Sequence, residues 1–489
     1  MGHINMGQKS IKKNIFMNVI LTVSNFLFPL ITYGYVARVL GADGTGKVAF
    51  VDSILAYFLY FASMGIPAYG RREVAKARDN RDKLSKLVNE LLVLNTISTV
   101  ISIIVLIIIV LFFPKLNSYS LLFLIMGVQI VLKLIGVEWF YEGTEEYTYI
   151  TIRSIIFKAI SVVLTFVLIR SKNDILWYAF VHVFTISASY ICNFINLRKY
   201  IDPQRPTLSD IKMHLQPVMV LFFAAIAITI HANFDVSMLG LMDSEYSVGI
   251  YNIALKIKSI VISISSALTA VMIPRLSYYF NKKDDENAIN LLSKSIRLSF
   301  ITTIPVAFYV IINSIEVIKL VGGDEFIPAS GTLIVLMVCC VFLIITNLLG
   351  AQILIPLGLE KRYMQSVVVG VSINIILNLI LIPYYGAFGA SIGTLVTELW
   401  NVFWMSTGCL EYVNAIRKNV TVKTYIIGIV FASLANIIVK MYISRFNNIL
   451  VLSITTICFF GVYYGILFLC KEELFCSEIS KLYNKIRRS

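Results

Sequence analysis

Charged residues are scarce in this chain. Asp, Glu, Lys and Arg together make up 14% of its 489 residues, whereas a soluble globular protein carries about a quarter. The polar stretches between apolar runs are also short, which leaves no room for a soluble domain of ordinary size. The formal net charge is +14, but the basic residues form no single patch interleaved with aromatic residues, so nucleic-acid binding is not expected. These shortages exclude a soluble or nucleic-acid-binding protein.

Motifs of catalysis and metal binding are missing as well. None of the seven cysteines forms a C-x-x-C pair, so neither a disulfide framework nor a zinc site is predicted. We find no D-x-D motif, no metal-ligand spacing and no nucleotide-binding glycine loop. The loops on one side of the predicted helices are all short, although a polymerase or glycosyltransferase needs outward loops and grouped carboxylates for its chemistry. We therefore expect no enzyme activity, no cofactor and no metal.

Long apolar runs are what the chain has in their place. Hydrophobic residues make up 58% of the sequence, and runs of near membrane length recur from residue 15 to residue 470. Continuous runs favour helices over the alternating segments of a membrane β-barrel. The prediction is an all-α integral membrane protein with about fourteen transmembrane helices, at residues 15–39, 48–69, 87–113, 120–141, 150–169, 175–196, 215–240, 249–273, 298–318, 330–355, 363–383, 386–408, 424–442 and 448–470.

The distribution of basic residues predicts the orientation. With the N-terminus placed in the cytoplasm, and with Arg153 near the start of the segment 150–169 counted on the inside, 30 Lys and Arg fall in inside segments, 6 in outside segments and 6 within helices, which accounts for all 42. This asymmetry obeys the positive-inside rule. Residues 15–39 are too long for the core of a signal peptide and carry no cleavage site, so we interpret them as a retained helix. We expect a multi-pass protein of a bacterial plasma membrane with both termini in the cytoplasm.

The chain contains an internal repeat. Features of helices 1 to 4 recur in the same order in helices 7 to 10. They are a glycine-rich helix end, an Ile-Pro helix end followed by a basic loop, and a turn that begins with Gly and reaches Tyr four or five residues later. An even number of helices separates the copies, so both have the same orientation, as in transporters built from parallel repeats. The predicted organisation is two six-helix lobes, 1–212 and 213–410, around a central cavity, with two further helices and a cytoplasmic tail in 411–489. One lobe rocking against the other would give alternating access, and a monomer suffices.

Four short motifs resemble a known family. They are YVARVLGADGTG at 35–46, YGRREVA at 69–75, EWFYEG at 138–143 and GIYNIALK at 249–256. In this order they resemble the oligosaccharide flippases of capsule and O-antigen synthesis, which share a superfamily with multidrug/cation antiporters and the lipid II flippase. The resemblance implies a two-lobed fold with a cationic cavity. It also implies a substrate, an oligosaccharide repeat unit on undecaprenyl pyrophosphate that crosses from the inner to the outer leaflet.

Basic residues inside the predicted helices are the candidate substrate-binding groups, because a charge in a bilayer is costly and usually functional. Lys and Arg are the natural partners of phosphate. Each candidate also has a structural alternative, namely snorkelling to the headgroups, anchoring at the interface, or pairing with a carboxylate. The candidate cavity cations are Lys256, Lys258, Arg38, Lys133 and Lys158.

Ion coupling has a candidate pair of its own. His231 and Asp235 are four residues apart in one predicted helix and therefore share a face. Such a pair could relay protons. The alternative is that Asp235 pairs with a lysine such as Lys256 and holds two helices together. Asp52 and Glu398 also lie deep enough to need partners, and salt bridges across helices are their expected role.

The sequence thus favours a flippase for a lipid-linked oligosaccharide. A cation-coupled multidrug exporter on the same scaffold is the alternative, although its cationic substrates need an acidic cavity rather than basic groups. The expected partners are the lipid-linked substrate and membrane lipids, with other polysaccharide-assembly proteins as further candidates.

Overall fold

The chain folds into two compact helical units, Met1–Gly249 and Ile250–Ser489. The computed structural model describes residues 11–486, except for a number of side chains in the first, tenth, eleventh and last α-helices, that of His231 among them. Within this described part, all regular secondary structure is helical. The all-α prediction is confirmed.

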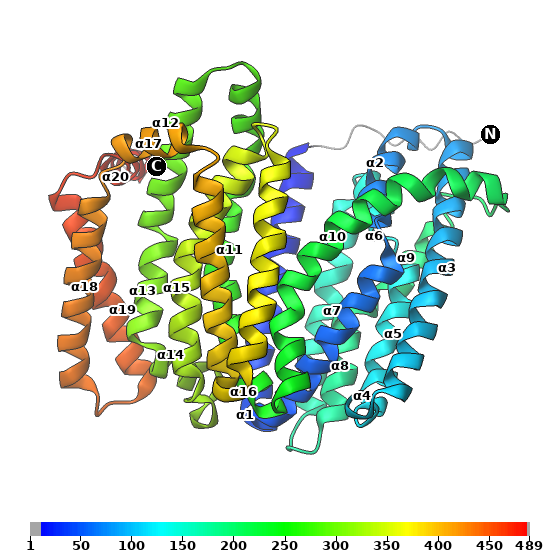
Figure 1. Ribbon diagram of the computed structural model, residues 1–489, viewed down its shortest axis with the longest axis horizontal. Helices are drawn as coiled ribbons and strands as arrows, with labels where there is room; N and C mark the ends of the chain where they lie inside the picture. Colours follow the sequence, from blue (N-terminus) through cyan, green and yellow to red (C-terminus); the bar gives the residue numbers. More distant parts are fainter. Residues whose placement is uncertain (1–10, 487–489) are drawn as a thin grey trace. The chain divides into compact units, whose positions relative to one another are not determined.

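The first unit is built around its long first helix. This helix, α1, packs against α3, α5, α7 and α10, and all of them can be followed in the blue to green part of Figure 1. The helices are α1 (Ile11–Ser63), α2 (Ile66–Ala77), α3 (Arg81–Phe112), α4 (Pro114–Asn117), α5 (Ser120–Gly136), α6 (Glu138–Gly143), α7 (Tyr147–Leu168), α8 (Ile175–Ser187), α9 (Ser189–Leu197) and α10 (Leu208–Met242).

The second unit begins within α11 (Glu245–Asn281), the helix that crosses the division. Here α15 packs against α13 and α16, and α18 packs against α19. The remaining elements are α12 (Asp285–Ile301), α13 (Thr303–Ile312), α14 (Ser314–Gly322), η1 (Asp324–Phe326), α15 (Ala329–Asn347), the π-helical η2 (Leu348–Leu354), α16 (Glu360–Ser406), α17 (Leu410–Asn419), α18 (Val422–Ile443), α19 (Asn448–Leu469) and α20 (Glu473–Ile486).

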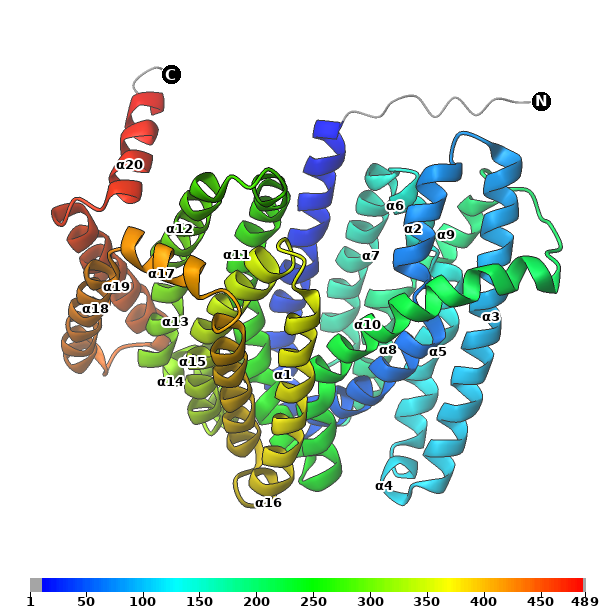
Figure 2. The same ribbon diagram turned by 45° about the horizontal axis from the view of Figure 1, so that its top comes forward.

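Two helices turn back on themselves at a glycine. The backbone of Gly41 has φ 71° and ψ −174°, and that of Gly386 has φ 51° and ψ −128°. A side chain strongly disfavours such angles. Each glycine therefore divides its helix into two arms, and Figure 2 shows the hairpin that α16 makes. The arms correspond to predicted helices 1 and 2 in α1, and to predicted helices 11 and 12 in α16.

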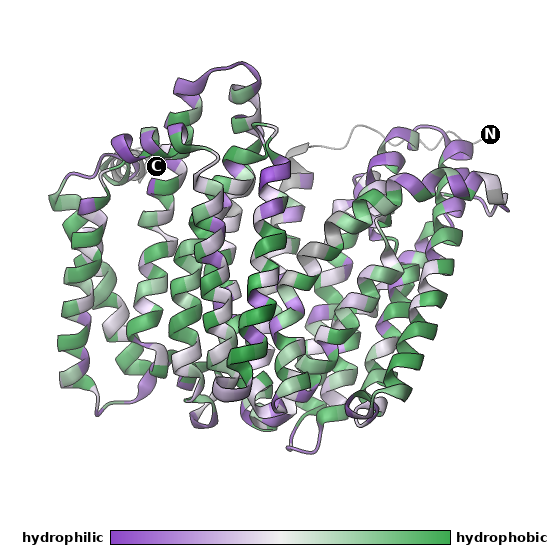
Figure 3. Ribbon diagram, in the orientation of Figure 1, coloured by the Kyte–Doolittle hydropathy of each residue, from purple (hydrophilic) through white to green (hydrophobic). Residues whose placement is uncertain are grey.

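Helices long and apolar enough to span a membrane occur in both units. Among the described residues, eleven stretches meet that requirement by length and composition. Figure 3 shows the pattern clearly in α18 and α19, which are apolar along most of their length, with polar residues in the loop that joins them. The protein is therefore a multi-pass membrane protein. The count of fourteen helices stays a prediction.

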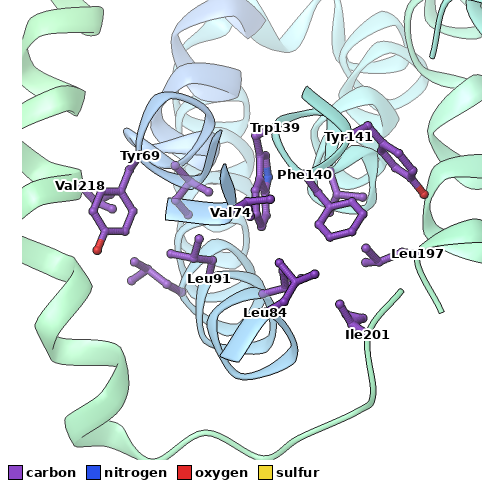
Figure 4. Packing of buried hydrophobic residues seen from close by; sticks show 14 of the residues in the cluster. Tyr69, Val74, Leu84, Leu91, Trp139, Phe140, Tyr141, Leu197, Ile201 and Val218 are labelled. Carbon is purple, nitrogen blue, oxygen red and sulfur yellow. The ribbon is translucent and has the colours of Figure 1, made fainter. Parts of the chain in front are cut away.

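Two of the four sequence motifs, at residues 69–75 and 138–143, contribute to a hydrophobic core of the first unit. Tyr69 and Val74 of α2 pack with Trp139, Phe140 and Tyr141 of α6 (Figure 4), and the cluster also includes side chains of α3, α7, α9 and α10. A Cβ on Gly70 would lie 2.6 Å from the Trp139 ring. Only a glycine permits this close approach. Both motifs thus serve packing.

The lobe boundary predicted at 212/213 differs from the division between the units. The contacts place α10 in the first unit, where it packs along α1. The predicted extra helices, α18 and α19, belong to the second unit and contact α13. The two functional lobes stay a prediction.

Candidate functional site

A charged cluster lies inside the first unit and contains one predicted cation. Glu138 accepts from three groups: its carboxylate oxygens lie 3.5 Å from Lys133 Nζ, 3.4 Å from Arg153 Nη2 and 3.3 Å from the Tyr190 hydroxyl. Lys133 also donates to the Tyr190 hydroxyl over 3.4 Å and lies over its ring. Two cations against one carboxylate leave a formal charge of +1 when all three side chains are ionised.

The backbone between α5 and α6 brings this cluster together. Val137 has φ 39° and ψ 35°, a left-handed conformation that is a rare outlier for a β-branched residue. It turns the chain directly after α5, so that Glu138 returns to Lys133 of the preceding helix. Strain of this kind persists only where the surrounding structure fixes it, and it often marks a functional site.

Lys158 is a second buried cation of this unit. Its side chain on α7 is 8% exposed. It donates to Ser24 Oγ over 3.1 Å and to Asn25 Oδ1, both on the first arm of α1. These are neutral partners. Among the described contacts, the hydrogen bonds of Lys158 go to neutral groups, and the charge of Glu138 acts on it without a direct ion pair.

The other predicted site residues are distributed over both units. Arg38 is an exposed residue on α1, whereas Asp235 is buried on α10. Lys256 is exposed and Lys258 partly buried on α11, in the second unit. His231 belongs to α10, but its side chain lies outside the described residues. A binding role for Arg38, Lys256 and Lys258 stays a prediction, as does the coupling role of Asp235 and His231.

Sequence analysis missed Arg153 as a site residue. It was counted with the inside loops, yet its side chain on α7 is only 6% exposed, and its Nε and Nη1 have no hydrogen-bond partner among the described residues. The sequence signal for Arg153 is Glu138, because a carboxylate within the membrane needs a cation as its partner.

Two histidine contacts were missed because they join distant parts of the sequence. His182 Nε2 on α8 lies 3.1 Å from Asp52 Oδ1 on α1. This gives Asp52 the partner on another helix that the sequence predicted. His214 Nδ1 lies 2.8 Å from the Tyr69 hydroxyl, and its Nε2 lies 2.8 Å from Glu90 Oε2, in a buried chain of three side chains.

A pocket of about 380 Å³ opens beside the charged cluster, entirely within the first unit. Side chains of α1, α2, α5, α8, α9 and α10 line it. They are Leu59, Tyr60, Ser63, Met64, Gly65, Pro67, Ala68, Gln129, Lys133, Ile186, Ser187, Tyr190 and Leu221. Among the described residues, no three His, Cys, Asp or Glu side chains come together as a metal site.

The fold is similar to that of solved membrane transporters. A solved structure titled as the lipid II flippase MurJ in an inward closed conformation superposes with a TM-score of 0.72 at 16% sequence identity, covering 94% of this chain and 99% of the other. An inward-facing multidrug transporter of the MATE family gives a TM-score of 0.56 at 14% identity, covering 85% of this chain and 97% of that one. These similarities establish the fold.

The sequence pattern of the polysaccharide biosynthesis proteins matches residues 11–280, more than half of the chain. The protein belongs to this family. The MatE pattern matches residues 221–380. An Escherichia coli protein named "Putative O-antigen transporter" is 23% identical over 402 residues, which cover 81% of this chain and 95% of that protein. "Probable low-salt glycan biosynthesis flippase Agl15" of Haloferax volcanii is 25% identical over 257 residues, 52% of this chain and 51% of its own length.

Proposed function

We propose that this protein is a flippase that moves a lipid-linked oligosaccharide across a bacterial plasma membrane. The carrier is undecaprenyl pyrophosphate, and the repeat unit passes from the inner to the outer leaflet by alternating access between two lobes. The product serves a surface polysaccharide such as capsule or O-antigen. The protein acts as a monomeric transporter and catalyses no covalent step.

The observation that carries this proposal is the positive charge within apolar helices of the first unit, on buried Arg153 and Lys158 and on half-buried Lys133. Lys158 makes its hydrogen bonds to neutral Ser24 and Asn25, and the cluster around Glu138 has one cation more than it has carboxylates. A buried cation without an equal negative charge is costly unless an anion joins it. A pyrophosphate supplies such a charge.

The relatives and the distribution of charge support the same proposal. The printed names of two relatives specify an O-antigen transporter and a glycan biosynthesis flippase. The excess of basic residues on one side, 30 against 6, supports cytoplasmic termini. The pyrophosphate would then first meet the protein at the side that carries the basic loops.

Transport of the lipid in proteoliposomes tests the proposal. We expect the purified protein to move a fluorescent polyprenyl-pyrophosphate saccharide between leaflets, and we expect Lys158→Met to slow this movement at least tenfold. The substitution keeps the length of the side chain and removes a buried charge, so the fold should tolerate it. Lys423→Met, which removes a charge from an exposed position at the start of α18, is the matched control. Wild-type protein that moves no such lipid would refute the function.

A cation-coupled multidrug exporter is the second candidate function, because the MatE pattern covers residues 221–380. An exporter of this kind binds lipophilic cations, which the surplus of positive charge in the first unit disfavours. Saturable binding of a lipophilic cation, with none of the pyrophosphate lipid, would favour this alternative.

A further inference from the structure

Two buried polar side chains at the pocket in the first unit have an atom without a described hydrogen-bond partner. Gln129 and Ser187 line it, and each is only 1% exposed. The Gln129 Nε2 and the Ser187 Oγ have no hydrogen-bond partner among the described residues. Buried polar groups are almost always satisfied in a working protein. Both groups can therefore donate to acceptor atoms of a water or of a ligand that enters beside them.

The charge at the same wall identifies the ligand as an anion. Lys133 lies one helical turn after Gln129, on the same face of α5, and it lines the pocket as well. Its contacts with Glu138 and Tyr190 are long, at 3.5 and 3.4 Å, and Arg153 shares the same carboxylate. An oxyanion could therefore accept a hydrogen bond from Lys133 without having to break a short salt bridge.

The remaining walls are apolar. Leu59, Met64, Pro67, Ile186 and Leu221 surround the space, so most of a ligand's surface would meet hydrocarbon. The volume of about 380 Å³ is at the small end of sites that bury small molecules. A ligand with an oxyanion head and an aliphatic chain fits both parts, and the rest of a longer chain would extend beyond the pocket.

The location of the pocket is consistent with the inner leaflet. The second arm of α1 ends at Ser63, within the pocket lining and directly before the basic residues of α2. Lys133 stands three residues before the end of α5. In the predicted orientation both positions lie toward the cytoplasmic face, at the depth where the phosphates of inner-leaflet lipids lie.

We propose that this pocket binds the phosphate group and the first chain segment of an anionic lipid from the inner leaflet. Lys133, Gln129 and Ser187 hold the phosphate oxygens, and the apolar wall holds the chain. The proposal deepens the proposed function and rests on it where the lipid is the polyprenyl carrier. An ordinary anionic phospholipid offers the same chemistry from a second source.

Native mass spectrometry of the full-length protein measures this binding. The probes are polyprenyl pyrophosphate, phosphatidylglycerol and uncharged polyprenol. We expect polyprenyl pyrophosphate to bind, with or without binding of phosphatidylglycerol. Polyprenol should bind at least tenfold more weakly, because it lacks the phosphate group that charge-assisted hydrogen bonds would hold. Equal binding of polyprenol would overturn the proposal.

Two independent variants address the site, so that a misfolded variant cannot decide the result. Lys133→Gln removes the charge, and Ala68→Phe fills the pocket from α2. We expect each to weaken binding of the phosphate lipid about tenfold or more. Ala75→Phe, an exposed position on the same helix that does not line the pocket, is the matched control and should bind like wild type.

The outcomes separate the two lipid sources and the two proposals. If the variants lose binding of polyprenyl pyrophosphate but keep that of phosphatidylglycerol, the ligand is the polyprenyl carrier. If they lose binding of both lipids, the pocket binds anionic lipids in general. Wild-type binding in both Lys133→Gln and Ala68→Phe overturns the pocket proposal. If the proteoliposome assay still records transport in that case, the flippase function stands without the pocket.

Discussion

Replacing Gly46 by alanine should destabilise the protein by about 1–3 kcal/mol, because overpacking against rigid neighbours costs about that much and sometimes more. A Cβ on Gly46 would lie 1.8 Å from the Glu245 carbonyl oxygen and 2.9 Å from the Gly249 nitrogen. The reverse contact is equally tight, with a Cβ on Gly249 2.1 Å from the Ala42 oxygen. The start of α11 and the second arm of α1 therefore touch backbone to backbone.

No side-chain rotation can relieve this collision. A normal contact needs about 3.4 Å, so one helix would have to move by roughly 1.5 Å through a close-packed interior. The better helix propensity of alanine returns only about 1 kcal/mol. We therefore expect a net loss, because the clash involves backbone atoms on both sides.

A thermal unfolding series in detergent, read by size-exclusion chromatography, tests the reasoning. Gly461→Ala is the matched control, since α19 leaves open space around a Cβ at that position. It should be neutral or slightly stabilising. Gly46→Ala should unfold at a clearly lower temperature than both wild type and this control. An unfolding midpoint for Gly46→Ala equal to that of Gly461→Ala would refute the proposed backbone contact.

Two further predictions concern polar contacts of the first unit. Glu90→Ala leaves His214 Nε2 without its partner at 2.8 Å and should cost about 1–3 kcal/mol in the same assay, whereas Glu411→Ala, at an exposed position of α17, should change little. A hydrogen bond from Thr207 and the nearby Lys86 lower the pKa of the Asp210 carboxyl to about 2. The folded pKa lies below the unfolded value of about 3.9, so the ionised carboxylate stabilises the protein above pH 4 and this contribution disappears as the pH falls toward 2. The difference in unfolding temperature between wild type and Asp210→Asn should thus be present at pH 6 and shrink toward pH 3; a difference that grows on acidification would contradict this assignment.

The positions of the helices were predictable because one physical quantity determines them. An apolar run of about twenty residues has few alternatives to a membrane helix. Even the interrupted segment at 150–169, which carries Arg153 and Lys158, forms α7 (Tyr147–Leu168). Those two cations did not break the helix, and each contacts a neighbouring helix: Arg153 pairs with Glu138 on α6, and Lys158 donates to Ser24 on α1.

The candidate site was less predictable, because contacts between distant residues decide it. The four-residue spacing of His231 and Asp235 is visible in a sequence, whereas the pairing of His182 with Asp52 spans 130 residues and is not. Lys133 is a predicted site residue only because it lies within a predicted membrane helix. The left-handed turn at Val137, which brings Glu138 back to it, has no signature in a run of apolar residues.

Residues that carry the family resemblance and residues that line the pocket have different physical roles. Gly70 and Trp139 are in close packing contact, and Arg71 pairs with Glu142 over 3.1 Å, so the second and third motifs hold α2 against α6. The pocket draws its polar groups from α5 and α8 instead, at Gln129 and Ser187. Substitutions at these packing positions, unlike those at Glu138, should therefore act on folding. Substitutions at the pocket can alter which lipid binds without disturbing the scaffold, so ligand preference is free to differ between proteins that share these motifs.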